Sequence, residues 1–373
     1  VAQVQSFPLI AIPFFMLTGS LMMGGKLGEA LIGVLSSLIG RFHGGPGQVG
    51  VLSSTIFGGV SGSAVADASA IGSLLIPWQK RLGYPPAFSA ATLAAAATID
   101  ILIPPSIPMI LFALSSNTSV AALFVAGILP GLLMCGGFMA VCWWVGKRRN
   151  FPRETQRMNW SVFRTQLLYA SPALVLPVLI VVFLRFGVAT PTEVAVLSTL
   201  YAGVISVLVY KDLGLQRLHR CVIDAGLATG VVLLVIMASA AIGWLLTFDR
   251  MPDGVVAWAQ ENLSSAWSVI LMMNVLMLVC GMFIDLPAAV LLLTPVFVPL
   301  ANAIGMDLVQ LGIMMTVNLA IGLYTPPVGT TLFITSSLAK VKVGETVREL
   351  GPFYLVAFGV LLLVSYVPAL IFK

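Results

Sequence analysis

Apolar stretches long enough to cross a lipid bilayer recur along most of this sequence. A bilayer-spanning helix needs about 20 predominantly apolar residues. Because the bilayer core offers no water to backbone groups, such stretches are expected to fold as helices, which satisfy their hydrogen bonds internally. The stretches are Phe7–Met23, Val49–Pro77, Ala87–Leu114, Val120–Val145, Gln166–Leu184, Val194–Val209, Ala228–Leu246, Ser268–Leu300, Leu308–Ser336 and Pro352–Phe372.

Composition and charge favour the same class. Of the 373 residues, 59% are hydrophobic and 9% are charged, whereas soluble domains carry about 25% charged residues. The apolar stretches lack the alternating polarity of β-barrel strands, so the predicted fold class is an all-α polytopic membrane protein. The net charge of +5 is spread over many loops, as in topology signals, and does not suggest nucleic acid. The cysteines have no metal-ligand spacing; they are Cys135, Cys142, Cys221 and Cys280.

Two of the apolar stretches are too long for one straight span and too short for two. Val49–Pro77 and Ser268–Leu300 each have roughly 30 residues and contain polar or helix-breaking positions. A re-entrant helical hairpin fits that length. Each is followed by a segment with two adjacent prolines, Pro104-Pro105 and Pro326-Pro327, which should break a helix because proline removes a backbone hydrogen bond and clashes with the preceding turn.

The two hairpin regions belong to an internal repeat. The Pro-Pro pairs are 222 positions apart, and the same offset relates Gly59 to Gly281, Pro77 to Pro299 and Gly83 to Gly305. The loops around the first hairpin are basic, with Lys26, Arg41, Lys80 and Arg81, whereas those around the second are mainly acidic. Positive loops stay cytoplasmic, so the two copies are predicted to be inverted.

Inverted repeats with helices broken at matching positions indicate a secondary transporter. We expect a first repeat over residues 1–146, with its hairpin at about 49–77 and its broken helix at about 87–114. A basic cytoplasmic loop and a connecting span should occupy 147–193. The second repeat should cover 194–373, with its hairpin at about 268–300 and its broken helix at about 308–336. The second copy begins with a span that the first lacks, so one N-terminal helix is expected to be absent.

Polar residues at the hairpins and breaks are candidates for binding. The first tip, "GGVSGSAVADAS", offers Ser61, Ser63 and Asp67, and irregular, oxygen-rich backbone at membrane depth suits a small cation such as Na⁺. It also suits simple helix packing, and Asp67 is equally well explained as a helix cap. Asp285 aligns with Ser63 in the second tip; an intramembrane carboxylate is a functional candidate, although it also has N-cap spacing.

Two further acidic residues lie near helix ends. Asp100 precedes the first Pro-Pro pair and aligns with Gly322 in the second copy. It could neutralise a cation, carry a proton, bind a polar substrate group or pair with a neighbouring donor, and the sequence leaves these open. Glu193 has capping-box spacing to Thr190, which favours a cap.

Rival functions have weaker support. "GVSG" around Ser61 fits the G-x-S-G pattern of rhomboid-type intramembrane serine proteases, but that chemistry needs a nearby histidine base, and His43 and His219 lie in basic loop regions. No G-x-x-x-x-G-K-[ST] sequence for ATP binding is present. A channel is not formally excluded. No enzymatic activity is therefore expected.

The motifs together resemble the large membrane subunit of tripartite ATP-independent periplasmic (TRAP) transporters, a DctM-like M subunit. "FPLIAIPFFMLTG", "GGVSGSAVADASAIGSLLIP", "LIPPSIPMILFAL", "ATPTEVAV" and "GLYTPPVGTT" carry the resemblance, which covers essentially the whole chain. It implies Na⁺-driven uptake of an organic anion, a carboxylate or sialic acid, by an elevator in which a transport domain moves against a scaffold. Implied partners are a periplasmic substrate-binding protein, a small four-helix membrane subunit and the lipids of the bacterial inner membrane. A related stand-alone Na⁺/dicarboxylate-type symporter is the alternative.

The resemblance also assigns residues, with Na⁺ as coupling ion and no other cofactor. The first Na⁺ site would comprise Ser61, Ser63, Pro104, Pro105 and Ser106. The second would comprise Asp285, Thr325, Pro326, Pro327 and Gly329. Substrate would sit between the hairpin tips, near Gly62, Asp67, Asp100, Thr330 and Thr331. Asp100 departs from the family pattern, where a small residue is usual.

Overall fold

The computed structural model describes residues 7–23, 26–153, 160–263 and 265–367, and these fold into helices without any strand. The first half contains η2 (Phe7–Ile10), α1 (Ala11–Met23), α2 (Lys26–Ile39), α3 (Gly45–Ser61), α4 (Ala64–Arg81), α5 (Pro86–Ala96), η3 (Ala97–Ile99), α6 (Ile107–Ser116), α7 (Val120–Arg148) and α8 (Trp160–Arg185). The second contains α9 (Pro191–Leu208), α10 (Leu215–Phe248), α11 (Met251–Asn262), α12 (Ala266–Phe283), α13 (Leu286–Ala303), α14 (Leu308–Gly322), α15 (Thr330–Ala339) and α16 (Val343–Tyr366).

Both predicted hairpins are pairs of contacting helices joined by very short turns. Helices α3 and α4 meet at Gly62-Ser63, and α12 and α13 meet at Ile284-Asp285. The first turn depends on Gly62, whose φ of 64° lies in the left-handed region that glycine adopts without steric cost. Ser63 then starts α4 as an N-cap whose hydroxyl accepts from the amide of Ala66. Each hairpin thus places a turn where two helices converge.

Both Pro-Pro segments interrupt helices as predicted. Between α5 and α6 the chain passes through η3 and an irregular stretch that ends at Ser106. Between α14 and α15 the irregular stretch runs over residues 323–329. The Pro104-Pro105 and Pro326-Pro327 peptide bonds are both cis. The order of hairpin, helix, break and helix therefore occurs twice.

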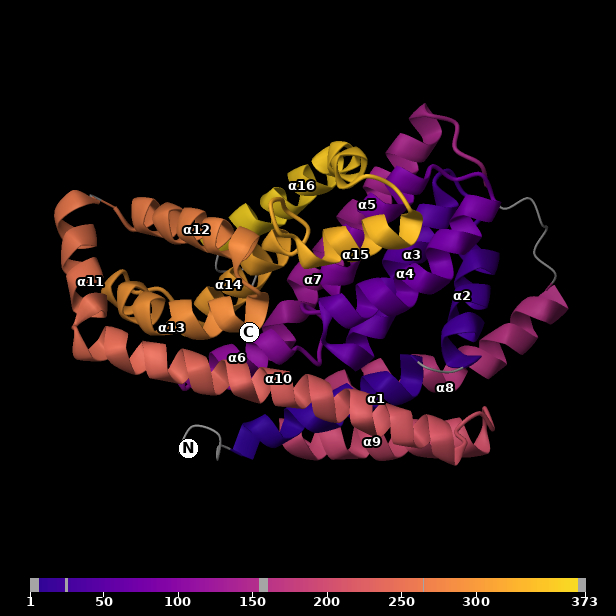
Figure 1. Cartoon of the computed structure of the whole chain (residues 1–373), viewed down its shortest axis with the longest axis horizontal. Helices are drawn as coiled ribbons and strands as arrows, with labels where there is room; N and C mark the ends of the chain where they lie inside the picture. Colours follow the sequence, from indigo (N-terminus) through magenta and orange to yellow (C-terminus); the bar gives the residue numbers. More distant parts are fainter. Residues whose placement is uncertain (1–6, 24–25, 154–159, 264, 368–373) are drawn as a thin grey trace.

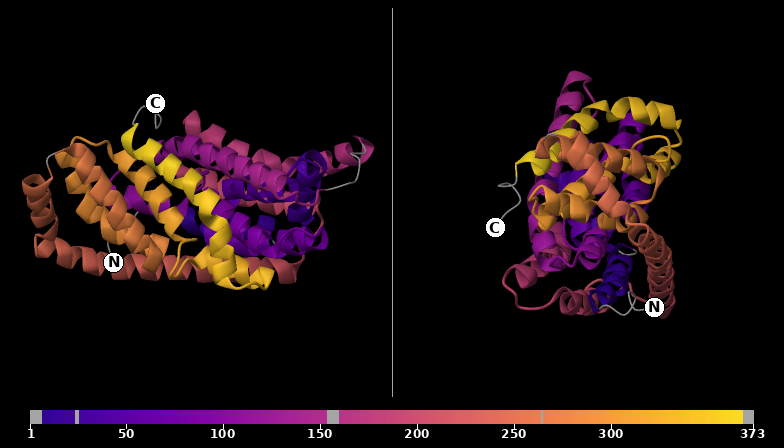
Figure 2. Two further views of the ribbon diagram at one scale, coloured as in Figure 1. Left: turned by 90° about the horizontal axis from the view of Figure 1, so that it is seen from above. Right: turned by 90° about the vertical axis from the view of Figure 1, so that its left-hand side faces the viewer.

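Helices of the two copies pack against each other. Helix α15 packs against α4 and α5, and α13 packs against α6. A further layer, in which α10 lies along α1 and α1 lies along α9, covers one side of these elements (Figure 1). Views from two other directions show α12, α13 and α11 at one end of the molecule and α2 and α8 toward the other (Figure 2). Aromatic rings fill the contact between α5, α7 and α16, with Phe88 and Phe138 both against Phe353.

Hydrophobic length supports several membrane crossings. Within the described residues, six helices are long and apolar enough to span a bilayer, or seven if the bent α8 counts as one span. The predicted capping box at the start of α9 is confirmed, with Thr190 and Glu193 each bonding the other's backbone amide. Part of the basic 147–164 loop, residues 154–159, lies outside the described residues.

Candidate functional site

The tip of the first hairpin is bound to the Asp100 carboxylate. Oδ2 accepts from the Ser61 hydroxyl at 2.7 Å and from the Ser63 amide at 2.8 Å, and Oδ1 accepts from the Gly62 amide at 3.1 Å. Asp100 follows η3 directly and is fully buried. Charge-assisted hydrogen bonds of this kind are roughly twice as strong as neutral ones. Asp100 therefore ties the tip of one hairpin to the start of the adjoining break.

The backbone of the same tip contacts the backbone of the first Pro-Pro segment. A Cβ added to Gly62 would lie 2.6 Å from the carbonyl oxygen of Pro105, so only glycine fits there. Ser106 ends the break: its hydroxyl donates to the Ile101 carbonyl at 2.6 Å, and it caps α6. The residues predicted for the first Na⁺ site thus lie together around the tip and the break, and the Asp100 carboxylate lies among them.

The second tip has a different construction. Asp285 is the N-cap residue of α13, but its side chain makes no capping hydrogen bond. A small cavity of about 10 Å³ lies beside it, between the tip and the second break. That volume is close to the smallest that holds one water molecule, which is also the scale of a small ion. The described residues that line it are Gly281, Met282, Phe283, Ile284, Asp285, Gly322, Leu323, Val328, Gly329 and Thr330.

The difference between the two tips follows from one aligned position. Gly322, the mate of Asp100, lies so close to the backbone of Gly281 that an added Cβ would overlap the Gly281 carbonyl. No carboxylate side chain fits at residue 322 without moving the hairpin. The first copy therefore places an additional carboxylate, that of Asp100, against its tip, whereas the second copy has an ion-sized space beside Asp285.

A larger cavity, of about 200 Å³, lies between the two hairpin tips. The first turns of three helices border it: Ala64 and Val65 of α4, Ile107 and Pro108 of α6, and Leu286 and Pro287 of α13. Helix N-termini carry a partial positive charge, although Pro108 and Pro287 have no N–H to donate. Ser63 and Asp285 add polar side chains, and no described residue that lines the cavity is basic.

Other predicted substrate residues lie away from this cavity. Thr331 is fully buried and donates its hydroxyl to the carbonyls of Leu323 and Ala94, which fixes α15 against α5. Asp67 is fully buried in the first turn of α4, and neither of its carboxylate oxygens has a hydrogen-bond partner within the described residues. Ser63, rather than Asp67, caps that helix. Thr325, predicted for the second Na⁺ site, donates its hydroxyl to the Ile321 carbonyl and does not line the small cavity.

Three apolar residues that line the central cavity were not predicted. Met16 of α1 and Val232 of α10 line it, as does Ile101 of the first break. Met16 and Val232 are apolar residues within apolar spans, so no motif in the sequence distinguishes them from lipid-facing positions. Their position in the wall of the central cavity is visible only from the packing of α1 and α10 around it.

The geometry does not support serine protease chemistry. His43 precedes α3 and Ser61 ends it, so the whole helix, roughly 25 Å by its rise per residue, separates them. The Ser61 hydroxyl donates to Asp100 instead. His219 lies on α10 and is exposed to solvent. The described residues also contain no group of three or more His, Cys, Asp or Glu side chains that could hold a metal ion, so backbone and hydroxyl oxygens would have to supply most ligands for Na⁺.

Comparisons with known proteins agree with this architecture. The family of the DctM component of tripartite ATP-independent periplasmic transporters matches residues 1–370. An uncharacterized protein, y4mL, from Sinorhizobium fredii is 58% identical over 99% of this chain and 88% of its own length. The 2,3-diketo-L-gulonate TRAP transporter large permease protein YiaN of Escherichia coli is 37% identical over 98% of this chain and 86% of its own length.

The fold is also found in a solved structure. The Alcanivorax borkumensis YdaH transporter, described as having an unusual topology, superposes with a TM-score of 0.68 over 98% of this chain and 86% of that chain. Its sequence identity is 16%, so this likeness concerns the fold alone. The named relative and the family are transport proteins rather than enzymes. The chain belongs to the DctM family, the large permease components of tripartite ATP-independent periplasmic transporters.

Proposed function

We propose that this chain is the membrane-embedded transport subunit of a Na⁺-coupled secondary uptake system for an organic anion. The observation that carries the proposal is the cavity between the two hairpin tips, where the N-termini of α4, α6 and α13 converge. Helix N-termini favour anions because the positive end of the helix dipole lies there. An organic carboxylate, such as the sugar acid named for the relative YiaN or a sialic acid, has the charge that this environment favours.

Coupling to Na⁺ is supported by the position of Asp285. This carboxylate borders both the ion-sized cavity at the second break and the central cavity. A Na⁺ ion in the small cavity would offset the Asp285 charge, which otherwise opposes entry of an anion next to it. Ion binding would thereby favour substrate binding, as symport requires. Thr330, whose buried hydroxyl has no partner in the described structure, would supply a further oxygen.

An elevator movement is consistent with what surrounds the central cavity. Its walls come from the hairpins and the first break on one side and from α1 and α10 on the other. Displacement of the hairpin elements along α1 and α10 would carry a bound anion with them. We propose that a periplasmic binding protein delivers the substrate and that a small four-helix membrane subunit completes the scaffold in the bacterial inner membrane.

The test is uptake by the complete three-component system in proteoliposomes. Wild-type transporter is expected to accumulate an organic acid from its binding protein when a Na⁺ gradient is imposed and to stop when K⁺ replaces Na⁺. Asp285→Asn should abolish Na⁺-driven uptake while the protein still inserts and assembles. Asp253→Asn, an exposed carboxylate in the first turn of α11, is the matched control and should leave uptake unchanged.

Two outcomes would contradict the proposal. Undiminished Na⁺-dependent uptake by Asp285→Asn would remove this carboxylate from the coupling mechanism. Uptake by the large subunit alone, without the binding protein and small subunit, would favour the stand-alone symporter instead.

A further inference from the structure

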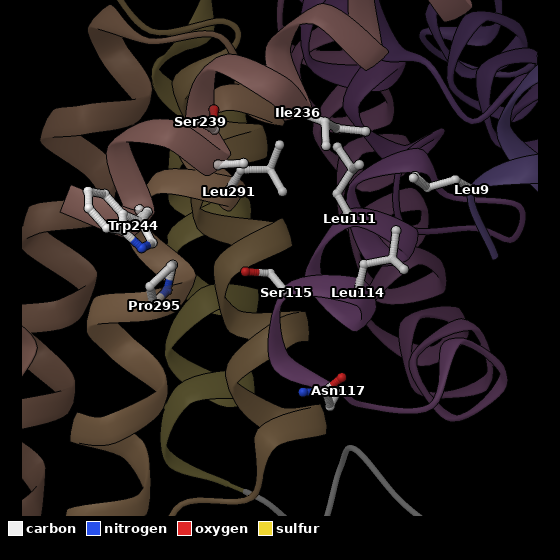
Figure 3. A pocket seen from close by; sticks show the side chains of 12 residues that line it. Leu9, Leu111, Leu114, Ser115, Asn117, Ile236, Ser239, Trp244, Leu291 and Pro295 are labelled. Atoms are coloured by element: carbon white, nitrogen blue, oxygen red, sulfur yellow. The ribbon is translucent and has the colours of Figure 1, made fainter. Parts of the chain in front are cut away.

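Three cavities follow one another along α10. The central cavity meets α10 at Val232. A cavity of about 520 Å³ lies toward the end of the helix, where Ile236, Ser239 and Trp244 border it (Figure 3). A cavity of about 500 Å³ lies toward its start, where Arg217, Arg220 and Asp224 border it. The central cavity is thus the middle member of a row that extends along one helix.

The central cavity and the cavity at the start of α10 share the same three walls. Along α1 the lining passes from Met16 to Ser20, and along α4 it passes from Val65 to Ala70. Along α10 it passes from Val232 to Asp224. At 1.5 Å per residue these steps correspond to roughly 6–12 Å. A molecule that leaves the central cavity along this seam would therefore enter the second cavity after about one or two helical turns.

The two outer cavities differ in chemistry. The cavity in Figure 3 is bordered mainly by aliphatic and aromatic groups, with Ser115, Asn117 and Ser239 as its polar side chains. The cavity at the start of α10 is bordered by Arg217, Arg220, Asp224 and Gln216. That end of α10 adjoins Lys211, and basic segments mark the cytoplasmic side. We therefore expect the charged cavity to lie on the cytoplasmic side; we call it the exit vestibule.

Some of the charged side chains in the exit vestibule hold helices together, and others are exposed. Arg217 forms a 2.6 Å salt bridge with Asp212 and donates to the Leu21 carbonyl at 2.8 Å, so it fixes α10 to α1. Arg220 is exposed and forms no salt bridge within the described part of the chain. Asp224 lies one turn further along α10 and is also exposed. Arg220 and Asp224 are available to a ligand.

We propose that the exit vestibule binds the substrate as it leaves, with Arg220 holding its carboxylate and Asp224 accepting from its hydroxyl groups. This rests on the proposed function, which supplies the anion. It also narrows the substrate class to hydroxylated monocarboxylates. A second carboxylate would lie next to Asp224, and juxtaposed like charges are unfavourable, whereas a hydroxyl would donate a charge-assisted hydrogen bond.

The experiment compares variants of the assembled transporter in proteoliposomes, with gluconate and succinate as probes. Wild type should transport gluconate in preference to succinate. Arg220→Gln should weaken the apparent affinity for gluconate about tenfold, the change expected when one contact of moderate strength is lost, and Arg220→Lys should restore most of it. Arg81→Gln, an exposed basic residue at the end of α4 outside the vestibule, should match wild type. Asp224→Asn should reduce the discrimination against succinate.

Each alternative result overturns a stated part of the proposal. Equal effects of Arg220→Gln and Arg81→Gln would indicate that the charge serves membrane topology or lipid contact. Unchanged kinetics in Arg220→Gln would exclude the exit site, even though Na⁺-driven uptake by wild type upholds the proposed function. Preference for succinate would overturn the substrate class.

Discussion

The Asp100 carboxylate accepts a 2.7 Å hydrogen bond from the hydroxyl of Ser61, across the contact between the first hairpin and the first broken helix. Both residues are buried. The second copy of the repeat has no equivalent, because Gly322 takes the place of Asp100 and lies against the Gly281 backbone. The two halves of the molecule thus share a backbone plan but hold their hairpin tips by different interactions.

Replacing Asp100 with alanine should destabilise the protein. The substitution removes the acceptor of the Ser61 hydroxyl and of the Gly62 amide, and the shorter of the two hydrogen bonds that the Ser63 amide donates. Unsatisfied buried donors cost about 1–3 kcal/mol each, with partial relaxation expected among neighbours. We expect a total loss of roughly 3 kcal/mol, measured as a lower thermal unfolding midpoint in detergent. Asp100→Asn keeps an acceptor oxygen and should lose less. Equal stability of Asp100→Ala and wild type would show that the hydrogen bonds between Asp100 and the hairpin tip do not stabilise the protein.

Gly62→Ala should disturb the first tip by two separate effects. Its φ of 64° is unfavourable for alanine by about 1 kcal/mol, and its added Cβ would overlap the Pro105 carbonyl. Gly187 is a matched control, because it has the same φ of 64° but open space around the added Cβ. Both Gly62→Ala and Gly187→Ala should lower the free energy of unfolding because alanine disfavours a positive φ. Gly62→Ala should lower it further, because of the clash with Pro105, and should also reduce uptake. Equal losses would show that the approach to Pro105 is unimportant.

Gly322→Ala should separate the second hairpin from α14. The new methyl group would meet the carbonyl of Gly281, a backbone atom that cannot rotate away. Gly226, within α10, has nothing within 4 Å of an added Cβ, so Gly226→Ala should stabilise its helix by up to about 1 kcal/mol. We expect opposite signs for the two changes in unfolding midpoint. A stabilising Gly322→Ala would mean that the hairpin tolerates a shift at this contact.

The lengths of the apolar stretches and the positions of the breaker residues predicted the hairpins and the broken helices. The length of the apolar stretches indicated hairpins, and the Pro-Pro pairs indicated breaks, because both signals are local consequences of backbone chemistry. The three-residue spacing of Thr190 and Glu193 likewise predicted the capping box at the start of α9. Asp100 was identified as unusual because the repeat aligned it with Gly322 and because it departs from the family pattern.

The partners of Asp100 could not be predicted from sequence. The sequence left four roles open for its carboxylate: neutralising a cation, carrying a proton, binding substrate or pairing with a neighbouring donor. That the amides of Gly62 and Ser63 donate to it is visible only in the structure. The same holds for Thr331, which appeared suited to substrate but bonds the carbonyl of Ala94, 237 positions away. Contacts between distant segments depend on packing, which a single sequence does not encode in local patterns.

Ser61 and Ser63 should respond differently to substitution by alanine, although only Gly62 separates them in the sequence. Ser61→Ala removes the hydroxyl that donates to Asp100, a bond to a charged group that contributes about 1.5–3 kcal/mol. Ser63→Ala removes the α4 cap, worth about 1 kcal/mol, but keeps the backbone amide that donates to Asp100. A double-mutant cycle with Asp100→Ala should therefore show coupling for Ser61 that clearly exceeds the coupling for Ser63, because only paired groups give non-additive losses. Additive losses for Ser61 and Asp100 would indicate that their hydrogen bond contributes nothing to the stability of the tip.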